Sequence, residues 1–326
     1  MIYTVTLNPS LDRTLTVPQF RYDEMALASH QRLDWGGKGF NVSRTLQALG
    51  AESIALGLAG GATGSMLERG LHALGITTDL VPLSGETRTN TVIIESATGR
   101  YIKVNEAGLA VQPAEQAALL DRIRGYLHRG DPRRDLWVLA GSLPPGLPGS
   151  YYADLVETVQ ASGTRVLLDA SGEPLRQGCA AAPFLVKPNA AEAIEFARSA
   201  LPSGHPSWSE GDSLDDAQSL SLVGPFLDSG VELVALSLGA GGLLLASVQQ
   251  AVRAIPPSVQ ARNPVGAGDA LLATLAWALE RDLPLDEAAR WAVAAGTAAA
   301  RNEGVAVVAR AEVQALYRQV VAHAVA

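Results

Sequence analysis

A short glycine-rich stretch that ends in an aspartate is the strongest chemical signal in the sequence. Residues 263–269 read Asn-Pro-Val-Gly-Ala-Gly-Asp and run directly into an apolar segment that predicts a helix. Unpaired backbone N–H groups at a helix start bind phosphate and other oxyanions, with the positive end of the helix dipole behind them. Gly266, Ala267 and Gly268 are therefore candidates to hold a phosphoryl group. Asp269 could take the proton of an attacking hydroxyl, although capping of the helix is the simpler role.

A second glycine-rich stretch surrounds a lysine. Gly36, Gly37 and Gly39 flank Lys38 at the point where a helix is predicted to begin. A helix start that carries a lysine suits an anion, because backbone N–H groups and a point positive charge act together. The spacing is not that of a P-loop, since neither the spaced glycine nor a Ser or Thr after the lysine is present. A flexible connection with a solvated lysine is the alternative interpretation.

Polar residues also follow two of the predicted buried strands. Asp12 ends a polar turn directly after the first strand, and Ser142 follows a later one in a loop rich in Gly and Pro. Ligands of open α/β sheets bind beyond the carboxyl ends of strands, so both residues are placed to bind one. Arg88 precedes another predicted strand and could fork onto phosphate or sugar oxygens. The simpler roles are a turn-stabilising aspartate and a solvated arginine.

Two further motifs suit a nucleotide. Lys187 begins Lys-Pro-Asn-Ala-Ala-Glu directly after a predicted strand, and Asn189 and Glu192 share one helical face. Such a pair can hold phosphate or water bound to Mg²⁺, although the same spacing is close to a helix capping box. The glycine-rich turn of residues 237–242 would let phosphates or a ribose approach the backbone, but it is a weak signal by itself.

The remaining segments alternate between short apolar runs and longer amphipathic ones. This alternation predicts an α/β protein in which a mainly parallel sheet has helices on both faces. The expected strands are 2–7, 53–58, 136–140, 165–169, 184–187 and 232–238. The expected helices are 41–49, 66–74, 114–128, 151–162, 214–228, 267–280, 284–301 and 311–322.

Two regions interrupt the alternation. Residues 15–17 with 29–35, and 91–95 with 101–104, read as strands without a helix between them, and Ser-Ala-Thr-Gly-Arg predicts a hairpin turn in the second pair. We expect them to form a small sheet that covers a site, inserted at about 12–36 and 88–106 of a single domain that spans 1–326. Residues 199–216, rich in Ser, Pro, Gly and acids, are expected to be a surface loop.

Composition narrows the class of protein. A hydrophobic content of 48% with 18% charged residues is typical of a soluble globular protein with a substantial hydrophobic core. The 25 basic and 33 acidic residues give a net charge of −8 without a basic run, which argues against nucleic acid as a partner. Cys179 is the only cysteine and residues 1–7 lack the basic start of a signal peptide, so a cytoplasmic location without membrane association is expected. The histidines have no zinc spacing, and no Gly-x-Ser-x-Gly motif supports a hydrolase.

Taken in sequence order, these motifs resemble those of the ribokinase-like carbohydrate kinases, the pfkB family. The resemblance extends from Thr4 to about Arg301, and it is specific because all six motifs occur in the family's order. Several motifs are similar to the phosphosugar branch of 1-phosphofructokinases and tagatose-6-phosphate kinases. Asn263-Pro264-Val265 resembles the tagatose-6-phosphate kinases, and residues 60–64 resemble both these enzymes and the minor 6-phosphofructokinase. The motifs therefore leave the ketose phosphate open.

The resemblance implies a three-layer α/β/α sandwich with a β-sheet lid. It also implies transfer of the ATP γ-phosphoryl group to a ketohexose monophosphate such as fructose 1-phosphate or tagatose 6-phosphate, with Mg²⁺ and with Asp269 as the base. The residues implied for the sugar are Asp12, Gly37, Asn41, Arg88, Asn90 and Ser142, with Lys38 and Lys103 for its phosphate. Those implied for ATP are Lys187, Asn189, Ser237, Gly239, Gly242 and Gly268, with Glu192 facing Mg²⁺ through water.

The lid is expected to join two subunits, as such lids commonly do in this family. A small isolated sheet is marginal in water, and apolar residues such as Val92, Ile94 and Ile102 would remain on its outer face. Burial of that face against the same sheet of a second subunit would give a homodimer with two-fold symmetry.

Three competing functions stay open. A 6-phosphofructokinase of the same family is one. A kinase of an unphosphorylated sugar or nucleoside is another, but such a substrate has no need of the two cations Lys38 and Arg88. A catalytically silent sensor of nucleotide or sugar is the third, and the presence of Asp269, Lys187 and Glu192 argues against it.

Overall fold

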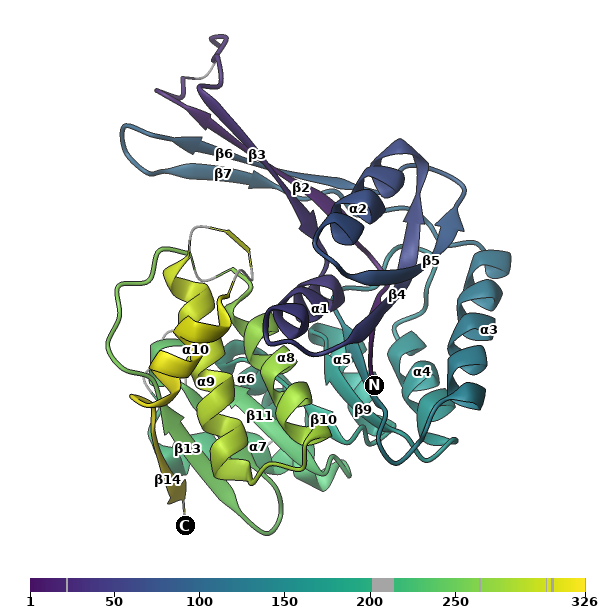
Figure 1. Cartoon of the computed structure of the whole chain (residues 1–326), viewed down its shortest axis with the longest axis vertical. Helices are drawn as coiled ribbons and strands as arrows, with labels where there is room; N and C mark the ends of the chain where they lie inside the picture. Colours follow the sequence, from purple (N-terminus) through teal and green to yellow (C-terminus); the bar gives the residue numbers. More distant parts are fainter. Residues whose placement is uncertain (22, 201–213, 264, 303, 306–307, 326) are drawn as a thin grey trace.

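The short apolar runs of the sequence form one ten-stranded sheet in the computed structural model (Figure 1). The structure describes residues 1–326 apart from 22, 201–213, 264, 303, 306–307 and 326. The strands lie in the order β14-β13-β12-β11-β10-β9-β8-β1-β4-β5. The parallel strands are β1 (Ile2–Thr6), β4 (Ser53–Gly60), β5 (Thr77–Leu83), β8 (Leu136–Ala140), β9 (Arg165–Asp169), β10 (Leu185–Val186) and β11 (Leu233–Ser237). The antiparallel edge consists of β12 (Leu243–Ala246), β13 (Ala251–Ile255) and β14 (Val321–Val325).

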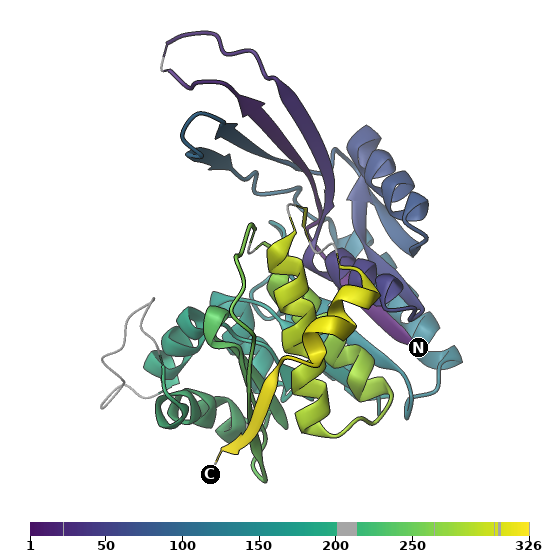
Figure 2. The same cartoon turned by 60° about the vertical axis from the view of Figure 1, so that its left-hand side comes forward.

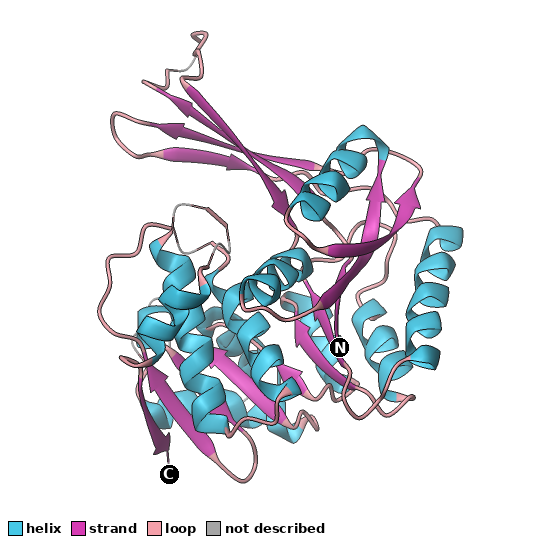
Figure 3. Ribbon diagram, viewed as in Figure 1, coloured by secondary structure: helices cyan, strands magenta, loops and turns pink. Residues whose placement is uncertain are grey.

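Helices cover both faces of this sheet, which confirms the predicted three-layer sandwich (Figures 2 and 3). One core lies between the sheet and the helices α1 (Lys38–Ala48), α8 (Ala267–Glu280), α9 (Leu285–Arg301) and α10 (Arg310–Tyr317). The core on the opposite face involves α3 (Pro113–Arg129), α4 (Tyr151–Gln160), α5 (Gly172–Ala180), α6 (Ala190–Ala200) and α7 (Asp216–Asp228). A smaller cluster packs α2 (Gly61–Ala73) onto β4.

The central strands are mostly apolar because both of their faces are covered. All five residues of β8 are buried, as are those of β1. Strands that are buried on both faces need continuous apolar runs instead of alternation, which is why these runs could be recognised in the sequence. Every strand expected for the large sheet is present.

The lid is a separate sheet of four strands that extends away from the sandwich (Figures 1 and 2). Its order is β3-β2-β6-β7, from β2 (Ser10–Val17), β3 (His30–Gly36), β6 (Thr89–Glu95) and β7 (Tyr101–Val104). The predicted hairpin is confirmed, since β6 and β7 pair in antiparallel fashion. The central pair, β2 with β6, is parallel and joins the two inserted segments.

Some expected boundaries were wrong. The helix predicted for 311–322 ends at Tyr317, and Val321–Val325 instead form β14 against β13. Backbone pairing at the open edge of the sheet overrides the helical preference of the alanines in this segment. The helices α1 and α2 begin earlier than expected, directly after the strands that precede them. Of the loop expected at 199–216, the first two residues end α6, and 201–213 lie outside the described residues.

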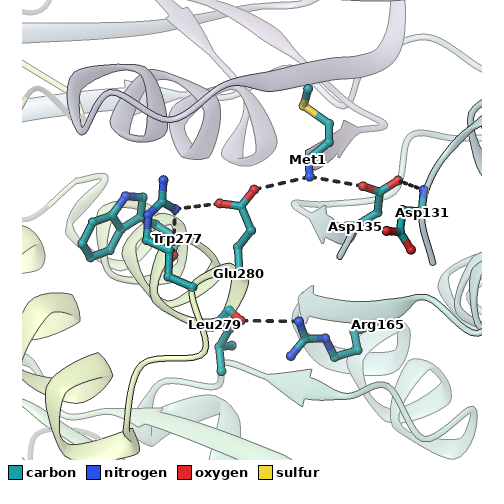
Figure 4. Close-up of polar contacts among 8 residues, drawn as sticks. Met1, Asp131, Asp135, Arg165, Trp277, Leu279 and Glu280 are labelled. Carbon is teal, nitrogen blue, oxygen red and sulfur yellow. Dashed lines mark hydrogen bonds and ion pairs between the residues drawn. The ribbon is translucent and has the colours of Figure 1, made fainter. Parts of the chain in front are cut away.

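The strands begin at the edge of the sheet that Figure 4 shows. The amino nitrogen of Met1 lies 3.1 Å from Oδ1 of Asp135 and 3.3 Å from Oε1 of Glu280. Nearby, Arg165 donates to the carbonyl oxygen of Leu279 across 3.4 Å. These contacts hold the C-terminal end of α8 at this edge, so its first turn lies toward the opposite edge, where the strands end. None of the described helices is both long and apolar enough to span a membrane.

Candidate active site

The first turn of α8 begins with a backbone conformation that favours glycine. Gly266 precedes the helix with φ of 84°, in the left-handed region where a side chain would be strained. Asp269 lies in this first turn and is 7% exposed. No side chain caps the N-terminus of the helix. Its first N–H groups are therefore available to an oxyanion, and Asp269 is not the helix cap that was its simpler interpretation.

Asn41 brings α1 to this turn. Its Nδ2 donates to Oδ2 of Asp269 across 2.7 Å, and both side chains are buried. Oδ1 of Asn41 is buried without a hydrogen-bond partner. A buried acceptor without a partner costs free energy unless a ligand donates to it, so this amide suits a substrate hydroxyl beside Asp269.

The carboxyl of Asp269 has a pKa above the ordinary range. Burial is the main cause, because it disfavours the charged form, and the negative charge of Asp169 adds to it. Lys38, the Asn41 hydrogen bond and Lys187 act in the opposite direction. A raised pKa makes the carboxylate a stronger base, as proton abstraction from a hydroxyl requires.

Two lysines flank one buried aspartate next to this base. Lys38 Nζ lies 3.0 Å from Oδ1 of Asp169, and Lys187 Nζ lies 3.3 Å from Oδ2. Burial opposes the ionisation of Asp169, but Lys187 and Lys38 outweigh it and hold its pKa below the usual range. Asp169 in turn is the main cause that raises the pKa of Lys38. Asp169 and Lys38 are therefore charged at neutral pH.

Lys187 also approaches the first turn of α8. A Cβ added to Gly268 would lie 3.4 Å from Nζ of Lys187, at van der Waals contact, so the ammonium group lies directly beside this turn. Lys187 is 5% exposed, and Lys38 reaches the same aspartate from α1. The first turn of α8 and these two ammonium groups thus form a phosphoryl seat, which brings together N–H donors of the kind that bind phosphoryl groups.

Asp169 is the residue of this cluster that the sequence reasoning missed. It ends β9, one of the strands that had been predicted. Asp12 and Ser142 were singled out because polar residues after a buried strand reach the carboxyl edge, and the same rule applied to Asp169 would have found it.

The residues predicted for the sugar lie around the root of the lid, which is the end of the small sheet where β2 and β6 begin. Asp12 is in β2 and not in a turn, because the strand already begins at Ser10. Its Oδ1 accepts from Oγ of Ser10 at 2.7 Å and from Nδ2 of Asn90 at 2.8 Å. Oδ1 of Asn90 is buried without a partner, as in Asn41. The hydroxyl of Ser142 accepts from Nδ2 of Asn8 at 3.3 Å.

Gly37 has φ of 139° and leads into α1, so the loop that carries Lys38 needs a glycine here. A Cβ at this position would also collide with Cγ2 of Thr6, at 2.7 Å.

The two other predicted cations are placed differently from Lys38. The guanidinium of Arg88 donates to the carbonyl oxygens of Asn8, Pro9 and Glu106 at 3.0, 3.3 and 2.9 Å. It therefore holds the root of the lid together, and only its remaining donors can serve a ligand. Lys103 is exposed on β7, opposite Val92. Among the described contacts, none joins Lys103 to the cluster around Asp269.

The residues predicted for the nucleotide and metal lie beyond β10 and β11. Asn189 and Glu192 form the capping box that was the alternative interpretation, with two reciprocal hydrogen bonds of 2.9 Å. Oγ of Ser237 donates to the carbonyl oxygen of Pro188 at 3.2 Å, which places the start of the glycine turn beside the Lys187 loop.

The glycine turn after β11 requires left-handed backbone at two positions. Gly239 has φ of 56° and Gly242 has φ of 85°. A Cβ at Gly242 would collide with the backbone oxygen of Ala254, at 2.0 Å. The turn is therefore tied closely to β13, and none of the residues in its short helix Gly239–Gly241 is buried.

The donor set suits a phosphate-bound magnesium ion better than a metal held by protein alone. Among the described residues, no group of three His, Cys, Asp or Glu side chains could hold a metal. Mg²⁺ is usually bound by one or two carboxylates together with phosphates and water. Glu192 uses Oε2 in the capping box and has a second carboxylate oxygen, so it fits an ion reached through water.

Comparison with known proteins agrees with this geometry. The profile of the "pfkB family carbohydrate kinase" matches residues 5–311. A 1-phosphofructokinase of Rhodobacter capsulatus is 38% identical over 90% of this chain and 88% of its own. An ATP-dependent 6-phosphofructokinase isozyme 2 of Mycobacterium tuberculosis is 33% identical over 97% and 88%, respectively.

Solved structures show the same fold. Phosphofructokinase-2 of Escherichia coli, in a crystal structure with potassium, superposes with a TM-score of 0.87 at 28% identity and covers 98% of both chains. Three findings lead to one assignment: a profile match over nearly the whole length, relatives above 30% identity and a shared fold. This chain belongs to the pfkB family of carbohydrate kinases.

Proposed function

We propose that this kinase transfers the γ-phosphoryl group of ATP to a hydroxyl of a ketohexose monophosphate, with fructose 1-phosphate as the preferred acceptor. The observation that carries the proposal is the buried Asp269 in the first turn of α8, beside two ammonium groups. A base, an oxyanion seat and fixed positive charge are what phosphoryl transfer to an alcohol requires.

In the proposed mechanism, Asp269 takes the proton of the acceptor hydroxyl as the oxygen attacks phosphorus. Asn41 holds the carboxylate in place through its 2.7 Å hydrogen bond and offers Oδ1 to a neighbouring hydroxyl. The backbone N–H groups of residues 266–268 cradle the phosphoryl oxygens, and Lys38 and Lys187 stabilise the charge that develops on them.

The nucleotide is proposed to lie between the Lys187 loop and the glycine turn. Ser237, Gly239 and Gly242 leave the backbone accessible to a ribose or phosphates, and Asn189 lies beside them. Glu192 would hold Mg²⁺ through water. When bound, the ion neutralises phosphate charge and orients the γ-phosphoryl group.

The sugar is proposed to lie under the lid, against Asp12, Asn90 and Ser142. The ring of hydrogen bonds that fixes Asp12 leaves Oδ1 of Asn90 buried and unpaired, which suits a sugar hydroxyl. Lys103 and the remaining donors of Arg88 are the cations proposed for the phosphate already on the sugar. Lys38 lies beside Asp169 and is proposed for the transferred phosphoryl group instead. Closure of the lid would exclude water and so limit hydrolysis of ATP.

The choice of fructose 1-phosphate rests on the relatives, several of which are named 1-phosphofructokinase. The M. tuberculosis relative supports fructose 6-phosphate instead, and residues 263–265 supported tagatose 6-phosphate. Release of ADP is measured with these three phosphosugars and with free fructose. We expect the highest kcat/KM with fructose 1-phosphate and a large loss in Asp269→Asn. A higher kcat/KM for another phosphosugar would change the substrate, and release that depends on no sugar would overturn the proposal.

The lid is also proposed to carry the subunit contact. Ile102 and Val104 share one face of β7 and are 37% and 58% exposed, and Leu27 in the neighbouring connection is 78% exposed. Val92 and Ile94, which were expected on the same face as Ile102, lie on the opposite face with Lys103. Apolar side chains so exposed on a small sheet are suited to a partner surface. A second copy of this chain would cover them through the same face, which gives a two-fold homodimer.

A further inference from the structure

Asp169 connects the two halves of the proposed active site, yet it has no part in the chemical step. Its carboxylate is 1% exposed and contacts one lysine with each oxygen. Lys38 belongs to the sugar side, at the start of α1, and Lys187 to the nucleotide side, directly after β10. One buried carboxylate thus fixes two cations that come from segments far apart in the sequence.

Without this carboxylate the two ammonium groups would lose their direct ion pairs, and the more weakly coupled Asp269 would be the remaining nearby carboxylate that acts on both. Like charges that share a site of low dielectric repel each other strongly, and flexible lysine side chains relieve such repulsion by moving apart. Nζ of Lys187 lies beside the first turn of α8, 3.4 Å from the position that a Cβ on Gly268 would take. Asp169 is therefore what keeps both ammonium groups next to the first turn of α8.

We propose that Asp169 is a positioning residue for phosphoryl transfer, whose buried carboxylate fixes Lys38 and Lys187 beside the phosphoryl seat and acts on the base Asp269 through its charge. The inference rests on the proposed kinase function. Asp169 touches neither the acceptor hydroxyl nor the phosphoryl group in this arrangement, so its effect passes through the two lysines and Asp269.

The electrostatic part of this role has a definite sign. The charged groups that face Asp269 are Asp169 from β9, Lys38 from α1 and Lys187 from the loop after β10, and Asn41 is its hydrogen-bond partner. After burial, Asp169 is the next cause that raises the pKa of Asp269, and the two lysines lower it. Loss of the Asp169 charge therefore lowers the pKa of Asp269 and makes it a weaker base that stays ionised to lower pH.

The test compares the pH dependence of kcat in the wild type, Asp169→Asn and Asp169→Glu. We expect Asp169→Asn to lose about 10–100-fold in kcat, as misplaced groups do, and its acid limb to move to lower pH. Asp169→Glu keeps the charge but displaces it, so kcat falls while the acid limb stays near the wild-type position. Asp135→Asn is the matched control, since Asp135 is a buried aspartate beside an amino group at the opposite edge of the sheet (Figure 4). It should leave both kcat and the acid limb unchanged.

A second measurement does not depend on turnover. The pKa of Asp269 is followed by ¹³C NMR of its carboxyl group in the wild type and in Asp169→Asn, and we expect it to fall in the variant. An unmoved acid limb together with an unmoved carboxyl titration would overturn the inference. If Asp169→Asn does not fold, the test rests on Asp169→Glu. A reduced kcat with an unmoved acid limb would support Asp169 as a positioning residue, and a wild-type kcat would contradict it. If the wild type phosphorylates none of the sugars, the proposed function is wrong. The NMR titration would still show whether Asp169 changes the pKa of Asp269.

Discussion

Nδ2 of Asn41 donates to Oδ2 of Asp269 across 2.7 Å, which joins the first turns of two helices whose residues are 228 positions apart. The contact packs α1 against α8 at the carboxyl edge of the sheet. Among the described contacts, Oδ1 of Asp269 accepts no hydrogen bond. One oxygen of the proposed base is thus held in place while the other remains for the proton of a substrate.

The first prediction concerns this base. Asp269→Asn should lower kcat by roughly 10²–10⁴-fold, the usual contribution of a positioned base, and should leave nucleotide binding nearly intact. The measurement is steady-state ADP release together with calorimetric titration of nucleotide. If the variant keeps more than about a tenth of the wild-type kcat, Asp269 does not act as the base.

The same substitution should stabilise the fold. Because the pKa of Asp269 is raised in the folded state, its charged form destabilises the protein at pH values above that pKa. An uncharged Asn removes this cost, and we expect the free energy of unfolding at pH 8 to rise by about 1 kcal/mol, as in other trade-offs between stability and activity. The gain should shrink in acid, where Asp269 itself becomes neutral. Urea unfolding at both pH values checks the sign, and a less stable variant at pH 8 would contradict it.

The raised pKa of Asp269 also predicts how activity depends on pH. Only the ionised carboxylate can accept a proton, so kcat should fall as the pH drops through this raised pKa. The fall should begin above the ordinary aspartate value of about 3.9. The measurement is kcat against pH at saturating substrates, with the free energy of unfolding followed in parallel to exclude acid unfolding. A kcat that stays constant down to about pH 4 would show that no group with a raised pKa acts as the base.

The elements around the active site were largely predictable from the sequence. The helix predicted for 267–280 has the same bounds as α8, because glycines precede it and its apolar residues fill the interface with α9. The strands buried on both faces were recognisable for a similar reason. Propensity and periodicity act within one segment, and in these segments the tertiary contacts agree with them.

What depends on distant contacts could not be predicted in the same way. The end of the predicted helix 311–322 became β14 because β13 offers an unpaired edge, which local preference does not reveal. Arg88 was predicted to bind a substrate, but no pattern in the sequence showed that three backbone carbonyls surround it. The ion pairs of Asp169 likewise arise only when α1, β9 and β10 come together.

A buried arginine under the glycine turn gives the next prediction. Nε of Arg253 donates to the carbonyl oxygen of Gly241 at 3.2 Å, and its NH1 contacts Ser219 and Asp216 of α7 at 3.3 and 3.5 Å. Arg253 thus supports the proposed nucleotide turn from the side of the sheet. Arg253→Met should raise KM for ATP by about tenfold, since a hydrogen bond from a charged group contributes about 1.5–3 kcal/mol. KM for the sugar should hardly change.

Arg165→Met is the matched control for Arg253→Met. Arg165 also donates to a backbone carbonyl and contacts an aromatic ring, but it lies at the edge of the sheet where the strands begin (Figure 4). This control should leave both KM values unchanged. An equal rise of both KM values in Arg253→Met would indicate general loss of structure and not a role at the nucleotide turn.

The last prediction concerns the subunit contact through the lid. If the exposed apolar residues of β7 face a second subunit, the protein should have a mass near twice the 34.0 kDa of one chain by light scattering at micromolar concentration. Val104→Asp places a charge in this contact and should shift the population toward monomer, because an unpaired charge at an apolar interface is costly. Val248→Asp is the control, since Val248 is 75% exposed between β12 and β13, outside the lid. Equal masses for the two variants and the wild type, with a wild type that is fully active as a monomer, would rule out dimerisation through the lid.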